Sequence, residues 1–118
     1  MNFDIERVKI FVTVPIENVE DVRNAVCKEG AGIIGNYSYC TSQCNVTGTF
    51  KPNNKANPYV GTANAIEKVS EVRLESICEI EKVKFVVGSI RKAHLYEEPE
   101  IDIIPLVDEE DLIWKKYF

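Results

Sequence analysis

The feature that most constrains the fold is a switch from strand-like to helix-like hydrophobic spacing, which occurs twice along the chain. Residues 8–14 alternate apolar and mixed side chains with a period of two, whereas residues 17–29 place their apolar side chains at helical spacing. The same pair of patterns returns over residues 71–78 and 80–92. Two strand–helix units in one short chain predict two similar halves that pack around a shared core.

The spacing also predicts which side chains are buried and where the first helix begins and ends. Glu17 and Asn18 lie where a helix N-terminus needs acidic and capping side chains, and Gly30 is typical of a helix C-terminus. The predicted core residues are Val8, Ile10, Val12, Val14, Val19, Val22, Ala25, Val26, Val72, Leu74, Ser76, Cys78, Val83, Val86, Val87 and Ile90.

Further strand patterns complete the plan. Residues 37–50 are rich in Tyr, Cys, Thr and Val, which favour strands, and residues 100–106 alternate again. Residues 51–58 are turn-forming and belong to a long middle segment of the kind that is usually functional. Residues 108–118 predict a C-terminal helical turn that packs on the body or on a neighbouring subunit. The whole order predicts an α+β, ferredoxin-like fold, in which a βαββαβ antiparallel sheet carries two helices on one face.

The composition of the chain argues against some classes of partner. Lys and Arg number 14 and Asp and Glu number 19, so the net charge of −5 repels phosphate backbones and disfavours nucleic acid as a partner. No secretory pattern opens the chain and no stretch approaches the roughly 20 apolar residues of a membrane span. We therefore expect no membrane partner, a cytoplasmic location, reduced thiols at the four cysteines, and a single domain over residues 1–118.

The expected sheet leaves one face without a covering layer. Because both helices lie on the opposite side, the Tyr, Phe and Cys side chains of this open face would otherwise meet water. Such a face is commonly buried between copies of the same chain, so the sequence favours a homo-oligomer.

A set of short motifs follows in a fixed order, namely GAGIIGNY, Cys40, TGTFKP, ANPYVG, EVRLE, HLYEEP and DIIPL. Over residues 8–106 this set resembles the YqfO-type domain, which is inserted into many bacterial proteins similar to the NGG-interacting factor and also occurs alone. The resemblance implies a ferredoxin-like fold similar to that of CutA and the PII nitrogen regulators, and commonly a trimer. In the longer relatives the dinuclear metal site belongs to the surrounding domain, so neither its ligands nor a hydrolase activity is carried over. Relatives usually have Pro where this chain has Leu95, which leaves the geometry at His94 less fixed.

Three glycines follow the first predicted helix, at Gly30, Gly32 and Gly35. A phosphate-binding loop needs the free N–H groups of a helix N-terminus, whereas these glycines lie at a helix C-terminus. We interpret them as a helix cap followed by a tight turn.

His94 is the only histidine, and it lies close in sequence to Glu97 and Glu98. Together with Cys40, these side chains are acceptable ligands for a divalent metal ion. Their spacing matches no closed zinc motif, so the alternative is that His94 bonds the last carbonyls of its helix and the carboxylates are solvated. Cys40 and Cys44 lack the Cys-x-x-Cys spacing of zinc ribbons and are expected to be small buried residues.

Other side chains are candidates for ligand binding or subunit contacts: Asn36, Tyr37, Asn57, Tyr59, Arg73 and Glu75. Arg73 and Glu75 share one strand face and form either a surface ion pair or an inter-subunit contact. Asn57 and Tyr59 belong either to a ligand lid or to a loop that Tyr59 holds in place.

No Ser or Cys has a neighbouring His in the sequence, so no motif supports nucleophilic catalysis. The sequence therefore predicts a non-enzymatic oligomeric binding or regulatory module, whose site is formed by residues 30–59 and 94–105. The alternative is a divalent-metal-binding protein that uses His94 and the nearby carboxylates.

Overall fold

The predicted order of strands and helices is confirmed over residues 4–113, the part of the chain that the computed structural model describes. The strands are β1 (Arg7–Pro15), β2 (Thr41–Phe50), β3 (Glu67–Glu79) and β4 (Ile101–Leu106). The helices are α1 (Val19–Lys28), α2 (Val83–Ala93) and the short α3 (Glu109–Ile113), and the 3-10 turns η1 (Ile16–Asn18) and η2 (Ile80–Lys82) lead into α1 and α2.

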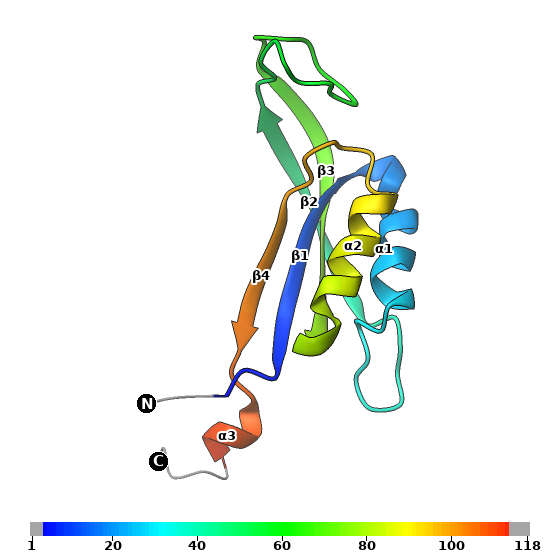
Figure 1. Cartoon of the computed structure of the whole chain (residues 1–118), viewed down its shortest axis with the longest axis vertical. Coiled ribbons are helices and arrows are strands. Elements are labelled where there is room, and N and C mark those ends of the chain that lie inside the picture. The colour runs from blue at the N-terminus through cyan, green and yellow to red at the C-terminus, as the bar shows by residue number, and fades with distance from the viewer. Residues whose placement is uncertain (1–3, 114–118) are drawn as a thin grey trace.

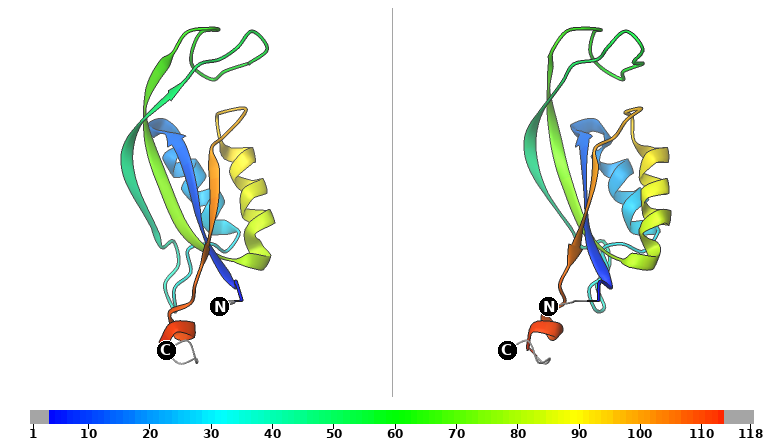
Figure 2. Two further views of the ribbon diagram at one scale, coloured as in Figure 1. Left: turned by 90° about the vertical axis from the view of Figure 1, so that its left-hand side faces the viewer. Right: turned by 60° about the vertical axis from the view of Figure 1, so that its left-hand side comes forward.

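The four strands form one sheet in the order β2-β3-β1-β4, and every neighbouring pair is antiparallel. Figures 1 and 2 show α1 and α2 side by side on one face of this sheet. The α+β, ferredoxin-like arrangement predicted from the sequence is therefore confirmed.

The core lies between the sheet and the two helices, where the hydrophobic spacing predicts it. The buried members of the predicted set are Val8, Ile10, Val12, Val14, Val19, Val22, Ala25, Val26, Val72, Leu74, Ser76, Cys78, Val86 and Ile90, and Val83 and Val87 are half-buried. Burying each Val, Leu or Ile side chain stabilises the fold by about 1.5–3 kcal/mol relative to leaving it exposed. This single apolar layer fixes how the two halves pack.

The β2–β3 hairpin is longer than the sequence predicts. β3 begins at Glu67 rather than at residue 71, and Phe50 pairs with Glu67 at the far end of the hairpin. Because β1 ends at Pro15 opposite Glu71, the hairpin continues past β1 as an arm. Figure 2 shows the loop at its tip curving back above the connection between α2 and β4. We call residues 51–66 the tip loop.

The glycine-rich segment after α1 is a helix cap and a turn, as predicted. Gly30 has a φ of 97°, and its N–H donates to the Cys27 carbonyl over 3.1 Å. Gly32 has a φ of 75°, and its N–H donates to the Ile77 carbonyl over 2.7 Å, which ties the turn to β3.

The residues before Thr41 do not join β2, although their composition favours a strand. Ile34 and Tyr37 exchange backbone hydrogen bonds of 2.9 and 3.0 Å across a tight turn, and Tyr39 has a left-handed φ of 58°. This local hairpin uses the backbone groups that a longer β2 would need.

The predicted C-terminal helical turn begins as α3, while residues 114–118 of that prediction lie outside the described residues. Between residues 4 and 113, no helix combines the length and the apolar character needed to cross a membrane.

Candidate functional site

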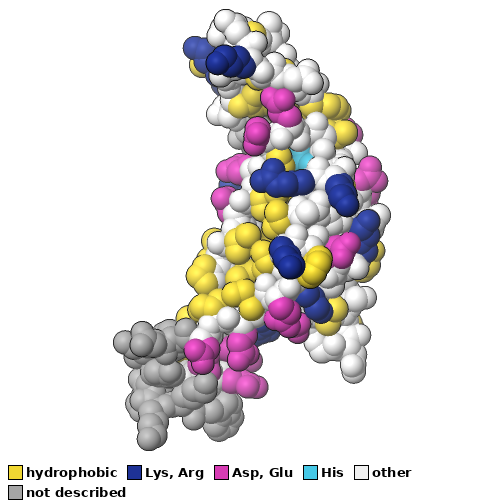
Figure 3. Space-filling view, viewed as in Figure 1, with side chains coloured by type: hydrophobic (Ala, Val, Ile, Leu, Met, Phe, Trp, Pro, Cys, Tyr) yellow, Lys and Arg dark blue, Asp and Glu magenta, His cyan; other side chains and the backbone are white. Residues whose placement is uncertain are grey.

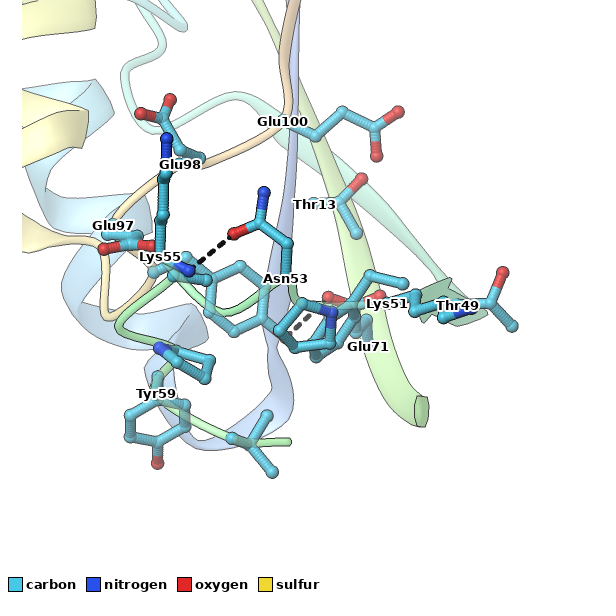
Figure 4. Close-up of a pocket in the computed structure, with 16 residues that line it drawn as sticks. Thr13, Thr49, Lys51, Asn53, Lys55, Tyr59, Glu71, Glu97, Glu98 and Glu100 are labelled. Atoms are coloured by element: carbon cyan, nitrogen blue, oxygen red, sulfur yellow. Dashed lines mark hydrogen bonds between the residues drawn. The ribbon is translucent and has the colours of Figure 1, made fainter. Parts of the chain in front are cut away.

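A cavity of about 530 Å³ lies between the tip loop and the connection from α2 to β4 (Figure 4). Its walls come mainly from residues 49–60 and 96–100, with Thr13 and Glu71 contributed by the sheet. Small-molecule sites commonly measure about 300–1,000 Å³. We call this space the tip cavity.

The two segments predicted to form a site do meet, but only in part. Tyr59, Glu97 and Glu98 line the tip cavity, and the backbone N–H of Asn57 donates to the Glu97 carboxylate over 2.9 Å. This hydrogen bond ties the tip loop to the α2–β4 connection. Residues 30–40 lie elsewhere, at the end of the sheet where α1 finishes (Figure 1).

Glu71 is the most deeply buried charged group of the tip cavity. It is not among the site residues predicted from the sequence. It is 5% exposed, and its carboxylate accepts a hydrogen bond of 2.8 Å from the Tyr96 hydroxyl. Among residues 4–113 no Lys or Arg forms an ion pair with it. A buried carboxylate without a cation is energetically costly, and such groups are often found at functional sites.

Gly48 makes room for that carboxylate. A Cβ at Gly48 would lie 1.5 Å from Glu71 Oε1, so a larger residue cannot coexist with the observed Glu71 position. Gly48 and Glu71 are close because Val46 pairs with Glu71 and the side chains of positions 46 and 48 share one face of β2.

Tyr96 connects the buried carboxylate to an aromatic wall. Its ring centroid lies 6.2 Å from that of Phe50 and 6.2 Å from that of Tyr59. Burial, reinforced by the hydrogen bond to Glu71, raises the pKa of Tyr96, so its hydroxyl remains a donor over the physiological range.

His94 follows α2 and holds Tyr96 in place. The ring is 7% exposed; its Nε2 lies 2.8 Å from the Thr13 carbonyl, and its Nδ1 accepts a hydrogen bond of 3.0 Å from the Tyr96 N–H. Since Nδ1 is an acceptor, Nε2 carries the proton and donates to Thr13. Burial lowers the pKa of His94, against weaker opposing effects of the Thr13 hydrogen bond and the Glu71 charge.

The expectation that the His94 side chain bonds the last helix carbonyls is therefore wrong. Only its backbone N–H bonds such a carbonyl, that of Ile90, over 2.8 Å. The His94 ring instead hydrogen-bonds to β1. Because β4 pairs with β1 only as far as Val12, the Thr13 carbonyl has no partner on β4, and His94 Nε2 donates to it.

Asn18 corrects a second expectation. Its side chain makes no capping bond to α1 but donates to the Ala93 carbonyl over 3.1 Å and accepts from the Leu95 N–H over 3.0 Å. The residue is 2% exposed and lies against the C-terminus of α2, where helix carbonyls lack partners. It thus joins the two halves of the fold directly beside His94.

The predicted metal ligands are not gathered within one chain. Both ring nitrogens of His94 are engaged, and Cys40 Sγ contacts the Ser38 carbonyl over 3.8 Å beside the Gly32 turn. Across the described residues, no group of three or more His, Cys, Asp or Glu side chains is arranged to hold a metal ion. Glu97 and Glu98 remain together at the rim of the tip cavity.

The two middle cysteines are not the buried residues that their spacing suggested. Cys44 is exposed and Cys40 is half-buried. Cys44 pairs with Arg73 across β2 and β3, where its side chain points to the open face of the sheet.

The remaining predicted residues lie away from the tip cavity. Asn36 and Tyr37 are exposed in the turn before β2, with Tyr37 75% exposed. The predicted ion pair between Arg73 and Glu75 is absent from the described part of the chain; Glu75 instead lies 3.6 Å from Lys9 Nζ. A lysine on the neighbouring strand is nearer than a residue two positions along the same strand.

Gly48 and Tyr96 lie within the two segments predicted to form the site but were not singled out, and Glu71 lies outside both, although each of the three belongs to one of the ordered motifs. The three residues are far apart in the sequence. Their contact depends on the strand register and on the path of the α2–β4 connection, which the sequence pattern does not reveal.

No family model matches the sequence. The GTP cyclohydrolase 1 type 2 homolog of Halalkalibacterium halodurans is 43% identical over 105 residues, which is 89% of this chain and 28% of that protein. The protein of the same name from Bacillus subtilis is 42% identical over 98 residues, which is 83% of this chain and 26% of that protein. The chain thus spans about a quarter of the length of the relatives it matches.

Solved structures give the same picture. A Bacillus cereus protein related to NIF3 matches with a TM-score of 0.77 and 37% identity, over 91% of this chain and 27% of that one. CutA from Archaeoglobus fulgidus matches with a TM-score of 0.64 and 20% identity, over 92% of this chain and 93% of that one. The chain is therefore similar to one segment of the GTP cyclohydrolase 1 type 2 homologs, and it shares its fold with CutA.

Proposed function

We propose that this chain is a non-enzymatic, oligomeric binding module that holds a small ligand in the tip cavity. The observation that carries the proposal is the buried Glu71 carboxylate, which lines a preformed cavity with aromatic walls. A protein keeps such a group where binding or regulation uses it, because burial of an unpaired charge otherwise costs stability.

The preorganisation of the tip loop supports a binding role. The N–H of Asn64 donates to the Pro52 carbonyl over 2.7 Å, and its side chain donates to Asn54 over 2.7 Å. The N–H of Lys55 donates to the Asn53 side chain over 2.9 Å. A loop that is already ordered loses little conformational entropy when a ligand enters.

The surface favours association between copies of the chain. Figure 3 shows apolar side chains gathered over β4 and the adjoining part of the sheet. In β4, Ile103 and Ile104 are 45% and 49% exposed. The likeness of fold to CutA and the resemblance to YqfO-type domains lead us to propose a trimer formed by one domain spanning residues 1–118, in the cytoplasm. Light scattering at working concentration is expected to give three times the monomer mass, and a monodisperse monomer would refute this part of the proposal.

Cyclohydrolase activity, as named for the longer relatives, is not proposed for this chain, which spans about a quarter of their length. Both nitrogens of the His94 ring are hydrogen-bonded, one to the Thr13 carbonyl and one to the Tyr96 N–H, so the ring is not available as a general base.

Divalent-metal binding is the second candidate function. It is favoured by the likeness of fold to CutA from Archaeoglobus fulgidus, a divalent cation tolerance protein, and by Glu97 and Glu98 side by side at the cavity rim. Ligation through His94 would require its ring to leave Thr13 or Tyr96, and a contribution from Cys40 would require a second copy of the chain. Calorimetry with zinc, copper and manganese tests this candidate, and no heat with any of them would end it.

The main proposal is tested by mapping amide chemical shifts while a library of small organic fragments is added. Bound fragments are expected to shift the signals of Tyr59, Tyr96 and Glu97. Ala56 lines the cavity, so Ala56→Phe should fill it and abolish these shifts, whereas Ala65→Phe, in an exposed part of the same loop, should not. The absence of any fragment that shifts the cavity signals would contradict the proposal.

A further inference from the structure

We propose that the tip cavity selects an organic cation, a compact molecule that carries an ammonium or guanidinium group on an apolar body. The inference rests on the proposed binding function and names the chemistry of the ligand.

The walls of the tip cavity carry more negative than positive side chains. The charged side chains that line it are four glutamates and two lysines, namely Glu71, Glu97, Glu98, Glu100, Lys51 and Lys55. Figure 4 shows the Lys55 side chain extended toward Glu98 at the rim. Lys51 and Lys55 are exposed, whereas Glu71 is buried, so the negative charge is the one held away from water. Electrostatic attraction is strongest where water is excluded, and here it favours a cation.

The Glu71 carboxylate has few hydrogen-bond donors within the described chain. Among the residues that the structure describes, its carboxylate has one hydrogen-bond donor, the neutral hydroxyl of Tyr96 on Oε2. A carboxylate can accept about four hydrogen bonds, so the group has unused capacity. The nearby His94 supplies no positive charge, because burial lowers its pKa and both of its nitrogens are engaged. A ligand ammonium or guanidinium would supply the missing donors and the compensating charge.

Aromatic rings form one wall of the tip cavity. Phe50, Tyr59 and Tyr96 all line the cavity, and the rings of Phe50 and Tyr59 are tilted by 55° and 49° to that of Tyr96. Ring faces attract cations within about 6 Å, and their apolar surface suits a hydrocarbon body. Aromatic rings beside a carboxylate are therefore complementary to an organic cation.

Size distinguishes this ligand from a bare metal ion. A volume of about 530 Å³ far exceeds the space that a metal ion needs, and the described side chains form no cluster of metal ligands. A hydrocarbon body fills the cavity while the cationic group reaches Glu71.

The test uses the full chain and fragments that differ only in charge: benzylamine, benzyl alcohol and benzoate. Calorimetry and amide chemical shifts at Tyr59 and Tyr96 are expected to show benzylamine binding most tightly. Glu71→Gln keeps an acceptor for Tyr96 but removes the charge, so it should weaken benzylamine about tenfold or more and leave benzyl alcohol unchanged. Glu79→Gln, on the same strand but outside the cavity, should affect none of the three.

A second variant guards against misfolding at position 71. Tyr59→Leu lies in the tip loop, where the side chain is 47% exposed, and it should weaken benzylamine more than benzyl alcohol by removing the ring face. Equal binding of the three fragments, or preference for benzoate, would overturn the inference and leave the binding function standing. Failure of all three fragments, and of the wider library, to enter the cavity would overturn both.

Discussion

The hydroxyl of Tyr96 donates a hydrogen bond of 2.8 Å to the carboxylate of Glu71, across 25 residues of sequence. The two side chains come from the α2–β4 connection and from β3, so their contact joins the second helix unit to the hairpin arm. The candidate site is built around this pair.

Replacing Tyr96 with Phe is expected to destabilise the fold by about 1–3 kcal/mol, because the buried Glu71 carboxylate loses its donor while the ring remains. The free energy of unfolding from urea denaturation measures this change. Tyr59→Phe is the matched control, since the Tyr59 hydroxyl makes no hydrogen bond with residues 4–113 and the side chain is 47% exposed. Equal stability of Tyr96→Phe and the unchanged protein would show that the hydrogen bond contributes nothing.

Gly48→Ala is expected to destabilise the chain by about 1–3 kcal/mol or more, because the new Cβ would lie 1.5 Å from Glu71 Oε1 and must displace it. Because Glu71→Ala removes the obstructing carboxylate, most of the cost of Gly48→Ala should disappear when both changes are present. A double-mutant cycle measures this difference. Gly88→Ala offers a control of opposite sign: its Cβ meets nothing within 4 Å in α2, so a gain of up to about 1 kcal/mol is expected. A loss from Gly48→Ala that is the same in both backgrounds would contradict the steric explanation.

The stability of the protein should depend on pH through His94. In the unfolded chain this group gains its proton as the pH falls through about 6.5, whereas the folded protein, in which burial lowers the pKa, gains it only at lower pH. Between the two pKa values the unfolded state therefore binds more protons than the folded state. The free energy of unfolding has its full value above about pH 6.5 and falls as the pH drops below it.

His94→Gln should remove this dependence, because His94 is the only histidine and histidine is the side chain whose ordinary pKa lies in this pH range. Urea midpoints between about pH 5 and pH 8 measure it for both proteins. Identical slopes in the two proteins would show that His94 does not cause the loss of stability.

Asn18→Ala is expected to cost about 1–3 kcal/mol for each backbone group left without a partner, namely the Ala93 carbonyl and the Leu95 N–H. Thermal or urea unfolding measures the change. Asn24→Ala, on the exposed side of α1, is the control and should leave stability unchanged or slightly raised. A loss at position 18 no larger than that at position 24 would refute the bridging role.

The sequence was sufficient for the fold because period and composition are local signals. The alternation in residues 8–14 and the helical spacing in residues 17–29 identify the buried faces without knowledge of any partner. The start of β3 was missed for the same reason: residues 67–70 continue the strand by pairing with β2 and not by burying an apolar face.

The site was only partly predictable. Tyr59 and Glu97 were found because they lie in turn-rich or acidic segments with evident local signals. Glu71 resembled an ordinary strand glutamate, and its burial arises from Gly48 across the hairpin and Tyr96 beyond α2. Asn18 resembled a helix cap until its neighbour in space, the end of α2, was known. Such contacts depend on register and connection paths, which composition does not encode.

The arm extends past the end of β1, and this has a kinetic consequence. The tip loop meets the α2–β4 connection through the bond from Asn57 to Glu97 and the rings of Tyr59 and Tyr96, and none of its residues belongs to the buried apolar core. Breaking these contacts costs far less free energy than unfolding the core. We therefore expect amide hydrogens of the tip loop to exchange much faster than those of β1. A ligand can then enter and leave while the four-stranded sheet stays intact.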